Sequence, residues 1–359
     1  MKRIYFRPSG AALPALGLLA ALALVFAAAV EIEPCFRGRE LRATMHRSAE
    51  RAGAAFDFLK ARRPGGVAGP RHDPAQSGLI GVWMSPVTSV YGNLQAKQTS
   101  ANPNFAALVA RMLAQAGIRP GDTVAVGLSG SFPALNVCAI TACEESGAVP
   151  VIVSGAASSQ WGANQPDWMW PDMEAALFQA GLLAHRSSAA SIGGASDGGL
   201  SLDPEGRRLA REAITRNNLH VIEEPTLDKA VQARMEIYLA HGRKPRAYIN
   251  VGGSSASVGS PADKRLPDPG LNLEPPEPAD FAQDSVMRRF SEAGVPIIHI
   301  SDLKELAQRE GLPWAPRETP APGSGAPFDS RERNRPLAGV LLAILAALAL
   351  RLRKAAARG

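Results

Sequence analysis

The stretch Thr123–Asn136, TVAVGLSGSFPALN, runs from an apolar segment directly into a helix start. Its centre is similar to a nucleophile elbow, in which a serine on a tight strand-to-helix turn attacks a carbonyl carbon. Gly127 and Ser129 fit that pattern, but the fifth position is Ser131 where the pattern has glycine. Ser131 is also suited to cap the following helix, with Pro133 in its first turn. The stretch therefore predicts a nucleophile, an anion-binding turn or only a tight connection.

A serine hydrolase also needs a base and an acid that orients the base. The chain order of α/β hydrolases, nucleophile then acid then histidine, is met by Ser129, then Asp172 or Glu223, then His299. His299 falls inside a predicted apolar strand, which is typical of a hydrogen-bonded core histidine. Ser129 is therefore the candidate nucleophile, and the favoured prediction is that it contacts a ligand.

Three loops rich in glycine and serine each follow a predicted strand: Gly127–Ser131, Ser154–Trp161 and Gly252–Gly259. Small residues permit tight turns whose amides converge, and serine hydroxyls add hydrogen-bond donors. The carboxyl ends of parallel strands meet at one edge of a sheet, so the loops predict one donor-rich site for carboxylate or phosphate oxygens. The alternative is that small residues only let helices pack closely on strands. The predicted ligand-binding residues in and beside these loops are Ser129, Gly130, Ser131, Ser158, Ser159, Trp161, Asn164, Gly252, Gly253, Ser254 and Ser255.

Lys97 is a predicted carboxylate partner for this site. It stands in the segment NLQAKQTS, which we expect to be a loop after the first strand. The alternative is a solvated surface lysine, which is the commoner use of this residue.

Other chemistries lack a signal. No Cys/His group has zinc spacing, and no Walker or dinucleotide glycine motif is present, so we expect no metal and no cofactor. The net charge of +6 comes from 39 basic and 33 acidic residues among 359, and no basic stripe is interleaved with aromatics. We therefore expect no nucleic-acid partner.

Short apolar runs alternate with helical segments between residues 79 and 314. The runs are continuously apolar, as in strands buried on both faces, which predicts an α/β fold with a mostly parallel open sheet and helices on both faces. The predicted strands are Leu79–Met84, Thr123–Leu128, Val149–Val153, His220–Glu223, Ala247–Val251 and Pro296–Ile300. The predicted helices are Asn104–Ala116, Phe132–Ser146, Asp172–Ala180, Pro204–Asn217, Leu227–His241, Phe281–Ala293 and Leu303–Glu310.

Both ends of the chain carry apolar runs. Residues 8–30 have no charge before Glu31 and follow basic residues, which predicts an N-terminal transmembrane anchor or, alternatively, a cleaved signal peptide. Residues 337–352 lie between arginine clusters and predict a C-terminal transmembrane helix; the alternatives are a sorting tail or a buried core helix. Between them we expect a juxtamembrane helix at 37–63, a linker at 64–78, the exported α/β domain at 79–314 with a proline-rich surface excursion at 260–280, and a linker at 315–336.

Four segments together carry a family resemblance: GVWMSPVTSVYGNLQAKQTSANPNFAALVARML, TVAVGLSGSFPALN, SSQWGANQPDWMWPDME and RAYINVGGSSASVG. They resemble the membrane-associated poly-γ-glutamate system proteins over roughly residues 79–260. The resemblance implies an accessory role in poly-γ-glutamate synthesis or export at a bacterial cytoplasmic membrane. It implies the polymer chain, membrane-embedded synthase or export subunits and the lipid bilayer as partners, and it assigns no catalytic residue.

The expected function is therefore binding of this polyanion by an extracytoplasmic α/β domain. A serine-dependent γ-glutamyl amide hydrolase or transferase acting on the polymer is one alternative. A scaffold for the synthase subunits that does not bind the polymer is the other.

Overall fold

A computed structural model of the chain describes residues 12–32, 36–66, 68–240, 242, 244–329 and 335–356. The chain divides into two units, residues 1–42 with 329–359, and residues 43–328. Residues 8–11 of the predicted N-terminal membrane run, and residues 330–334 of the predicted second linker, lie outside the described residues.

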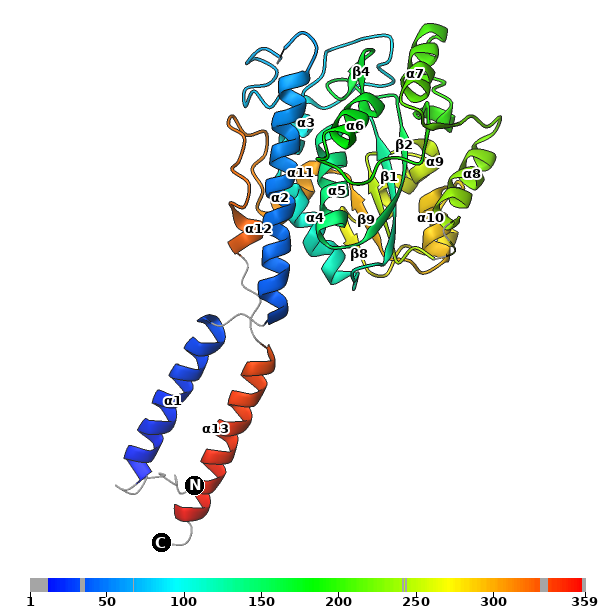
Figure 1. Cartoon of the computed structure of the whole chain (residues 1–359). Helices are drawn as coiled ribbons and strands as arrows, with labels where there is room; N and C mark the ends of the chain where they lie inside the picture. Colours follow the sequence, from blue (N-terminus) through cyan, green and yellow to red (C-terminus); the bar gives the residue numbers. More distant parts are fainter. Residues whose placement is uncertain are drawn as a thin grey trace, which may run out of the picture. The chain divides into compact units, whose positions relative to one another are not determined.

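The first unit contains an antiparallel pair of helices, α1 (Ala12–Ile32) and α13 (Arg335–Ala356), which lie side by side (Figure 1). Large apolar side chains remain exposed on both helices, among them Leu18 and Leu24 of α1 and Leu342 and Leu350 of α13. Within the described residues, no helix combines the length and the apolar composition that crossing a membrane requires.

The second unit is built around a seven-stranded sheet, which confirms the predicted α/β fold with a mostly parallel open sheet. Six strands are parallel, and β8 runs antiparallel to β9 at one edge. Every residue of the central strands β1 and β7 is buried, which accounts for their continuous apolar sequence. In spatial order the strands are β6 (His220–Ile222), β5 (Ala189–Ser191), β2 (Val149–Gly155), β1 (Thr123–Ser129), β7 (Ala247–Val251), β9 (Ile297–Ile300) and β8 (Gly270–Asn272). A separate two-stranded ribbon pairs β3 (Asn164–Gln165) with β4 (Trp168–Met169).

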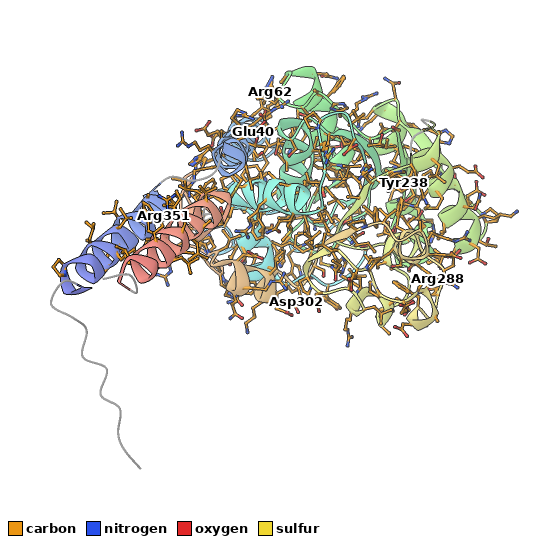
Figure 2. All side chains as sticks on the ribbon, turned by 90° about the horizontal axis from the view of Figure 1, so that it is seen from below. Glu40, Arg62, Tyr238, Arg288, Asp302 and Arg351 are labelled. Carbon is orange, nitrogen blue, oxygen red and sulfur yellow. The ribbon has the colours of Figure 1, made fainter. Side chains whose placement is uncertain are left out.

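Helices pack on both faces of this sheet (Figure 1). On one face, α8 and α10 bury residues such as Tyr238 and Phe290 against strand residues that include Ala125 and Ile297; Tyr238 is labelled in Figure 2. On the other face, α5 contacts β1, β2 and β7, and α4 packs against α5. Besides the long N-terminal helix described next, the α-helices of this unit are α3 (Leu94–Ser100), α4 (Asn104–Gln115), α5 (Pro133–Glu145), α6 (Trp170–Gln179), α7 (Pro204–Arg216), α8 (Leu227–Leu239), α9 (Ser255–Val258), α10 (Val286–Glu292), α11 (Leu303–Glu310) and α12 (Ala326–Asp329) among the described residues.

A long helix, α2 (Phe36–Arg62), occupies the segment predicted as a juxtamembrane helix. From residue 43 onward it belongs to the second unit and buries small and apolar side chains such as Ala52 and Leu59. Arg51 also donates to Glu144 and Glu145 of α5, at 2.6 and 3.2 Å. This part of α2 is therefore a packed element of the α/β unit.

The predicted strand Leu79–Met84 is wrong. This segment has no regular ladder, because it pairs with the irregular loop after β2 and not with a strand. The amide of Gly81 donates to the carbonyl of Trp161 at 2.9 Å, and the amide of Trp161 donates to Val82 at 3.1 Å. The chains approach so closely that a Cβ at Gly81 would lie 1.9 Å from the carbonyl oxygen of Gly162.

Two strands of the seven-stranded sheet were not predicted. β5 is only three residues long, and its sequence Ala-Ala-Ser carries too weak a pattern to be recognised. β8 lies inside the proline-rich excursion, which we expected to be an extended surface segment. Its place at the sheet edge explains how a strand tolerates prolines on either side.

One buried ion pair holds the loop after β5 to the helix layer. Both side chains, Arg234 of α8 and Asp197, are almost fully buried, and the Arg234 guanidinium donates to Asp197 at 2.8 and 3.0 Å and to Ser191 at 2.7 Å. Burial is the largest single influence on the pKa of Arg234 and lowers it. The charge and the hydrogen bonds of the Asp197 carboxylate oppose burial, and the pKa is raised overall. The pair fixes this loop at the carboxyl edge of the sheet.

Candidate functional site at the carboxyl edge of β1 and β7

The order of strands reverses its direction between β1 and β7. From β1 the chain builds outward to β2, β5 and β6, and then returns to place β7 on the other side of β1. In open α/β sheets this switch point opens a crevice beyond the carboxyl ends of the two strands, where ligands bind. Two of the three predicted loops, the one after Ser129 and the one that starts at Gly252, flank the switch point.

Ser129 and Gly252 face each other across it. A Cβ at Gly252 would lie 2.3 Å from the Ser129 hydroxyl oxygen, and Gly252 has a φ of 82°, so only glycine suits this position. The Ser129 hydroxyl is buried and has no hydrogen-bond partner within the described chain. A buried polar group left without a partner costs about 1–3 kcal/mol, and a ligand that bonds to Ser129 would recover that cost.

The N-terminus of α5 lies directly after this serine. The prediction that Ser131 caps the helix is wrong: the N-cap residue is Phe132, and no side-chain capping bond forms there among the described residues. The Ser131 hydroxyl instead accepts a hydrogen bond from the Ser159 amide at 3.0 Å. The thirteen-residue helix therefore presents an uncapped N-terminus, with its partial positive charge, beside the unpaired Ser129 hydroxyl.

Lys97 comes from the helix α3 and not from a loop as predicted, and the alternative of a solvated lysine is wrong because only 2% of it is exposed. Its ammonium donates to the carbonyl of Ser131 and, at 2.8 Å, to the hydroxyl of Ser159, and it lies 3.6 Å from the ring centre of Phe132. Within the described chain, no carboxylate forms an ion pair with it. Burial, with the nearby positive charge of Lys264, holds the pKa of Lys97 well below its usual value.

Lys264 is a site residue that the sequence did not reveal. It belongs to the proline-rich excursion, whose start is tied to the domain because the Asp263 carboxylate accepts from the amides of Ala282 and Gln283 at 2.7 and 3.2 Å. The Lys264 side chain passes 3.7 Å from the position of a Cβ at Gly253. Burial lowers the pKa of Lys264, and Asp302 opposes that change. A lysine in a proline-rich segment that is predicted to lie on the surface carries no sequence pattern that would assign it to a site.

Several other predicted ligand residues use their polar groups inside the protein. The Ser158 hydroxyl donates to the carbonyl of Ser159 at 2.8 Å, and the Asn164 side chain binds Val82 and Thr88. The Ser254 hydroxyl caps α9, and Ser255 accepts from the amide of Ser196. These residues hold the walls of the site in place, and their role as ligand contacts stays a prediction.

Close packing accounts for three of the glycines and for the tryptophan. A Cβ at Gly127 would lie 2.6 Å from the Tyr248 hydroxyl, and one at Gly130 would lie 2.6 Å from the Ala156 carbonyl. One at Gly253 would lie 3.0 Å from Val258. Trp161 stacks on the His72 ring, with 4.7 Å between ring centres. For Gly127 and Gly130 these neighbours belong to the adjacent strand β7 and to the loop after β2, so the contacts do not test the alternative that small residues let helices pack on strands.

The structure does not assemble the catalytic triad considered from the sequence. His299 is a core residue whose Nδ1 faces the Asn250 side-chain amide at 3.2 Å and whose Nε2 faces the Lys264 carbonyl at 3.1 Å. Burial and the charge of Lys264 lower its pKa to about 4, so the ring is neutral. The acids lie elsewhere, with Asp172 paired to Arg216 and Glu223 to Arg211.

No other clear site emerges from the described parts of the chain. They contain no group of three or more His, Cys, Asp or Glu residues that could hold a metal ion. A cavity of 420 Å³ lies between α2, residues 74–77 and residues 317–319, away from the switch point. Its lining carries both signs of charge, from Asp57, Lys60, Arg317 and Glu318, so it has no preference for one charge class.

Comparison with known proteins gives no relative. No protein-family model, no curated protein and no solved structure matches the chain. The resemblance to the poly-γ-glutamate system proteins therefore stays a prediction.

Replacing Gly252 by alanine tests the Ser129–Gly252 contact. We expect the G252A variant to lose about 2–4 kcal/mol in the free energy of unfolding. The positive φ is strained for alanine, and the added Cβ would clash with the Ser129 hydroxyl. In the S129A background the loss should be smaller by about 1 kcal/mol or more. Chemical denaturation of the four proteins of this double-mutant cycle measures the coupling.

Gly117 provides the matched control, since its φ is 76° and an added Cβ would meet nothing within 4 Å. G117A should show only the cost of the backbone conformation, about 1 kcal/mol, in both backgrounds. Equal losses for G252A with and without the Ser129 hydroxyl would contradict the contact.

Proposed function

We propose that this protein is an accessory protein of poly-γ-glutamate synthesis or export, and that its α/β unit binds the polymer at the switch point between β1 and β7. The observation that carries the proposal is the burial of Lys97 with no carboxylate partner among the described residues. Its ammonium lies against Phe132, which lines the Gly252–Gly253 turn together with the Lys264 side chain. The family resemblance of residues 79–260 supplies the identity of the polymer.

A carboxylate is the ligand that these groups suit. Burying a cation without a counter-ion is costly, and a ligand carboxylate would offset that cost at Lys97. Its two oxygens can accept hydrogen bonds from a lysine ammonium, from the free Ser129 hydroxyl and from first-turn amides of α5 at the same time. Each of these groups is a donor, and the two lysines make the site positive.

Substitution of Lys97 separates a ligand-binding lysine from a structural one. We expect K97M to lower the affinity for poly-γ-glutamate at least about tenfold at low ionic strength, because it removes one charge-assisted hydrogen bond. The free energy of unfolding should stay equal or rise by about 1–4 kcal/mol, since an apolar side chain replaces a buried charge. Isothermal titration calorimetry and chemical denaturation of the full-length chain provide the two measurements.

The control is K229M, which removes an exposed lysine from α8. It should leave both affinity and stability unchanged within about 0.5 kcal/mol. Polymer binding by the wild type should weaken with added salt. Absence of binding at low salt, or equal binding by K97M and K229M, would contradict the proposal and would favour a scaffold that does not bind the polymer.

The unpaired Ser129 hydroxyl favours one second candidate function, an amide hydrolase or transferase that acts on the polymer with Ser129 as nucleophile. Ser129 stands at the strand-to-helix turn where such a nucleophile is found. His299 is not available as its base, because both ring nitrogens face protein groups.

Polymer length in producing cells tests this candidate. If Ser129 is a nucleophile, S129A should abolish chain cleavage and shift the polymer to longer chains, whereas S324A, which changes an exposed serine outside the site, should not. Gel filtration of polymer from cells with each variant gives the distributions. Identical distributions for wild type, S129A and S324A would eliminate Ser129 as a nucleophile and leave it as a ligand contact.

We also propose that the helical pair of the first unit holds the protein at a bacterial cytoplasmic membrane, with the second unit on the extracytoplasmic side. Exposed apolar side chains on α1 and α13, such as Leu24 and Leu342, support membrane association. The basic residues that flank both apolar runs support the orientation. Synthase subunits embedded in the same membrane are the partners expected there.

Fractionation of cells tests the membrane association. We expect the wild type to sediment with membranes and an L24D/L342D variant to shift to the supernatant, because charged side chains in place of apolar ones oppose burial in lipid. L273D, which changes an exposed leucine of the second unit, is the control. Sedimentation unchanged by L24D/L342D would contradict a role for these helices in membrane association.

A further inference from the structure

We propose that the switch-point site binds the carboxyl-terminal end of the γ-linked chain and not its interior. The inference rests on the proposed function, because it concerns which part of the polymer enters the same site. Its basis is the enclosure of Lys97 together with the presence of a second lysine.

The two ends and the interior of a γ-linked glutamate chain differ in charge. Each internal residue has one carboxylate, attached directly to a main-chain carbon, because its other carboxyl group is used in the amide bond. The residue at the carboxyl-terminal end has that carboxylate and a free γ-carboxylate. The residue at the amino-terminal end has a free ammonium group in addition to its carboxylate. Two negative charges on one residue therefore occur only at the carboxyl-terminal end.

The surroundings of Lys97 favour a chain end. Its ammonium is enclosed by the Ser131 carbonyl, the Ser159 hydroxyl and the Phe132 ring, and 2% of the residue is exposed. An internal carboxylate is attached directly to the main chain of the polymer. It could therefore reach this ammonium only if the polymer on both sides of its residue also entered the site. A terminal residue enters with chain on one side only.

The charges around the site match the terminal residue. Lys97 comes from α3, and its ammonium lies 3.6 Å from the ring centre of Phe132. Phe132 lies 3.7 Å from the position of a Cβ at Gly252, and the Lys264 side chain lies 3.7 Å from that of a Cβ at Gly253, so both lysines line the same turn after β7. Two carboxylates on one residue can pair with both lysines. Asp302, which raises the pKa of Lys264, offsets part of the positive charge, and His299, whose Nε2 faces the Lys264 carbonyl at 3.1 Å, is neutral. The two lysines would repel the ammonium group of the amino-terminal end.

The stoichiometry of binding tests the inference. Isothermal titration calorimetry of the full-length protein would use two poly-γ-glutamate preparations of different and narrow length. We expect one protein bound per chain for both lengths, because each chain has one carboxyl-terminal end. A number of bound proteins that grows in proportion to chain length would overturn the inference and leave the proposed polymer binding intact. Absence of binding to either preparation would instead contradict the proposed function.

A small ligand pair tests the recognition of the second carboxylate. The dipeptide γ-glutamylglutamate should compete with the polymer, and its derivative with the terminal γ-carboxyl group converted to an amide should compete about tenfold less well. K264M should abolish this difference between the two dipeptides, whereas K229M should preserve it. Equal competition by both dipeptides against the wild type would overturn the inference.

Discussion

The parallel pairing of β1 with two neighbours is the constraint on which the site depends. β1 pairs with β2 along its whole length and with β7 from Val124 to Gly127, and no later strand can come between them. The chain leaves β1 through α5 toward β2 on one side, and it later forms β7 on the other side of β1. The loops that follow β1 and β7 therefore start at the same edge of the sheet and lead in different directions. Gly252 is therefore brought against Ser129, and the N-terminus of α5 opens beside them.

The elements outside the central strands supply charge and enclosure. α3 precedes the sheet in the sequence and brings Lys97, and the excursion after β7 brings Lys264. Residues 80–92 bond to the loop after β2 and hold Ser159 beside Lys97. Most hydrogen-bonding groups in these walls are satisfied inside the protein. Two groups differ from them among the described residues: the Ser129 hydroxyl has no hydrogen-bond partner, and Lys97 forms no ion pair with a carboxylate. These are the groups that the proposed ligand would contact.

The strongest patterns in the sequence predicted the fold well. Continuous apolar runs identified five of the six parallel strands. Capping residues located helices such as α7, where Asp203 accepts a hydrogen bond from the Gly206 amide at 2.7 Å and Pro204 follows. The prediction failed where local pattern and tertiary pairing disagree. Leu79–Met84 has the composition of a strand but meets a loop, and β8 has the composition of a loop but meets the edge of β9.

The sequence by itself determined that three loops of small polar residues follow strands of one parallel sheet, because the rule that carboxyl ends share an edge needs only the strand order along the chain. Which two loops meet depends on the strand order in space, so only the tertiary structure decided that Ser129 faces Gly252. Burial likewise depends on distant neighbours. Lys97 is enclosed by residues 34 and 62 positions away, and no local pattern could distinguish it from a solvated lysine.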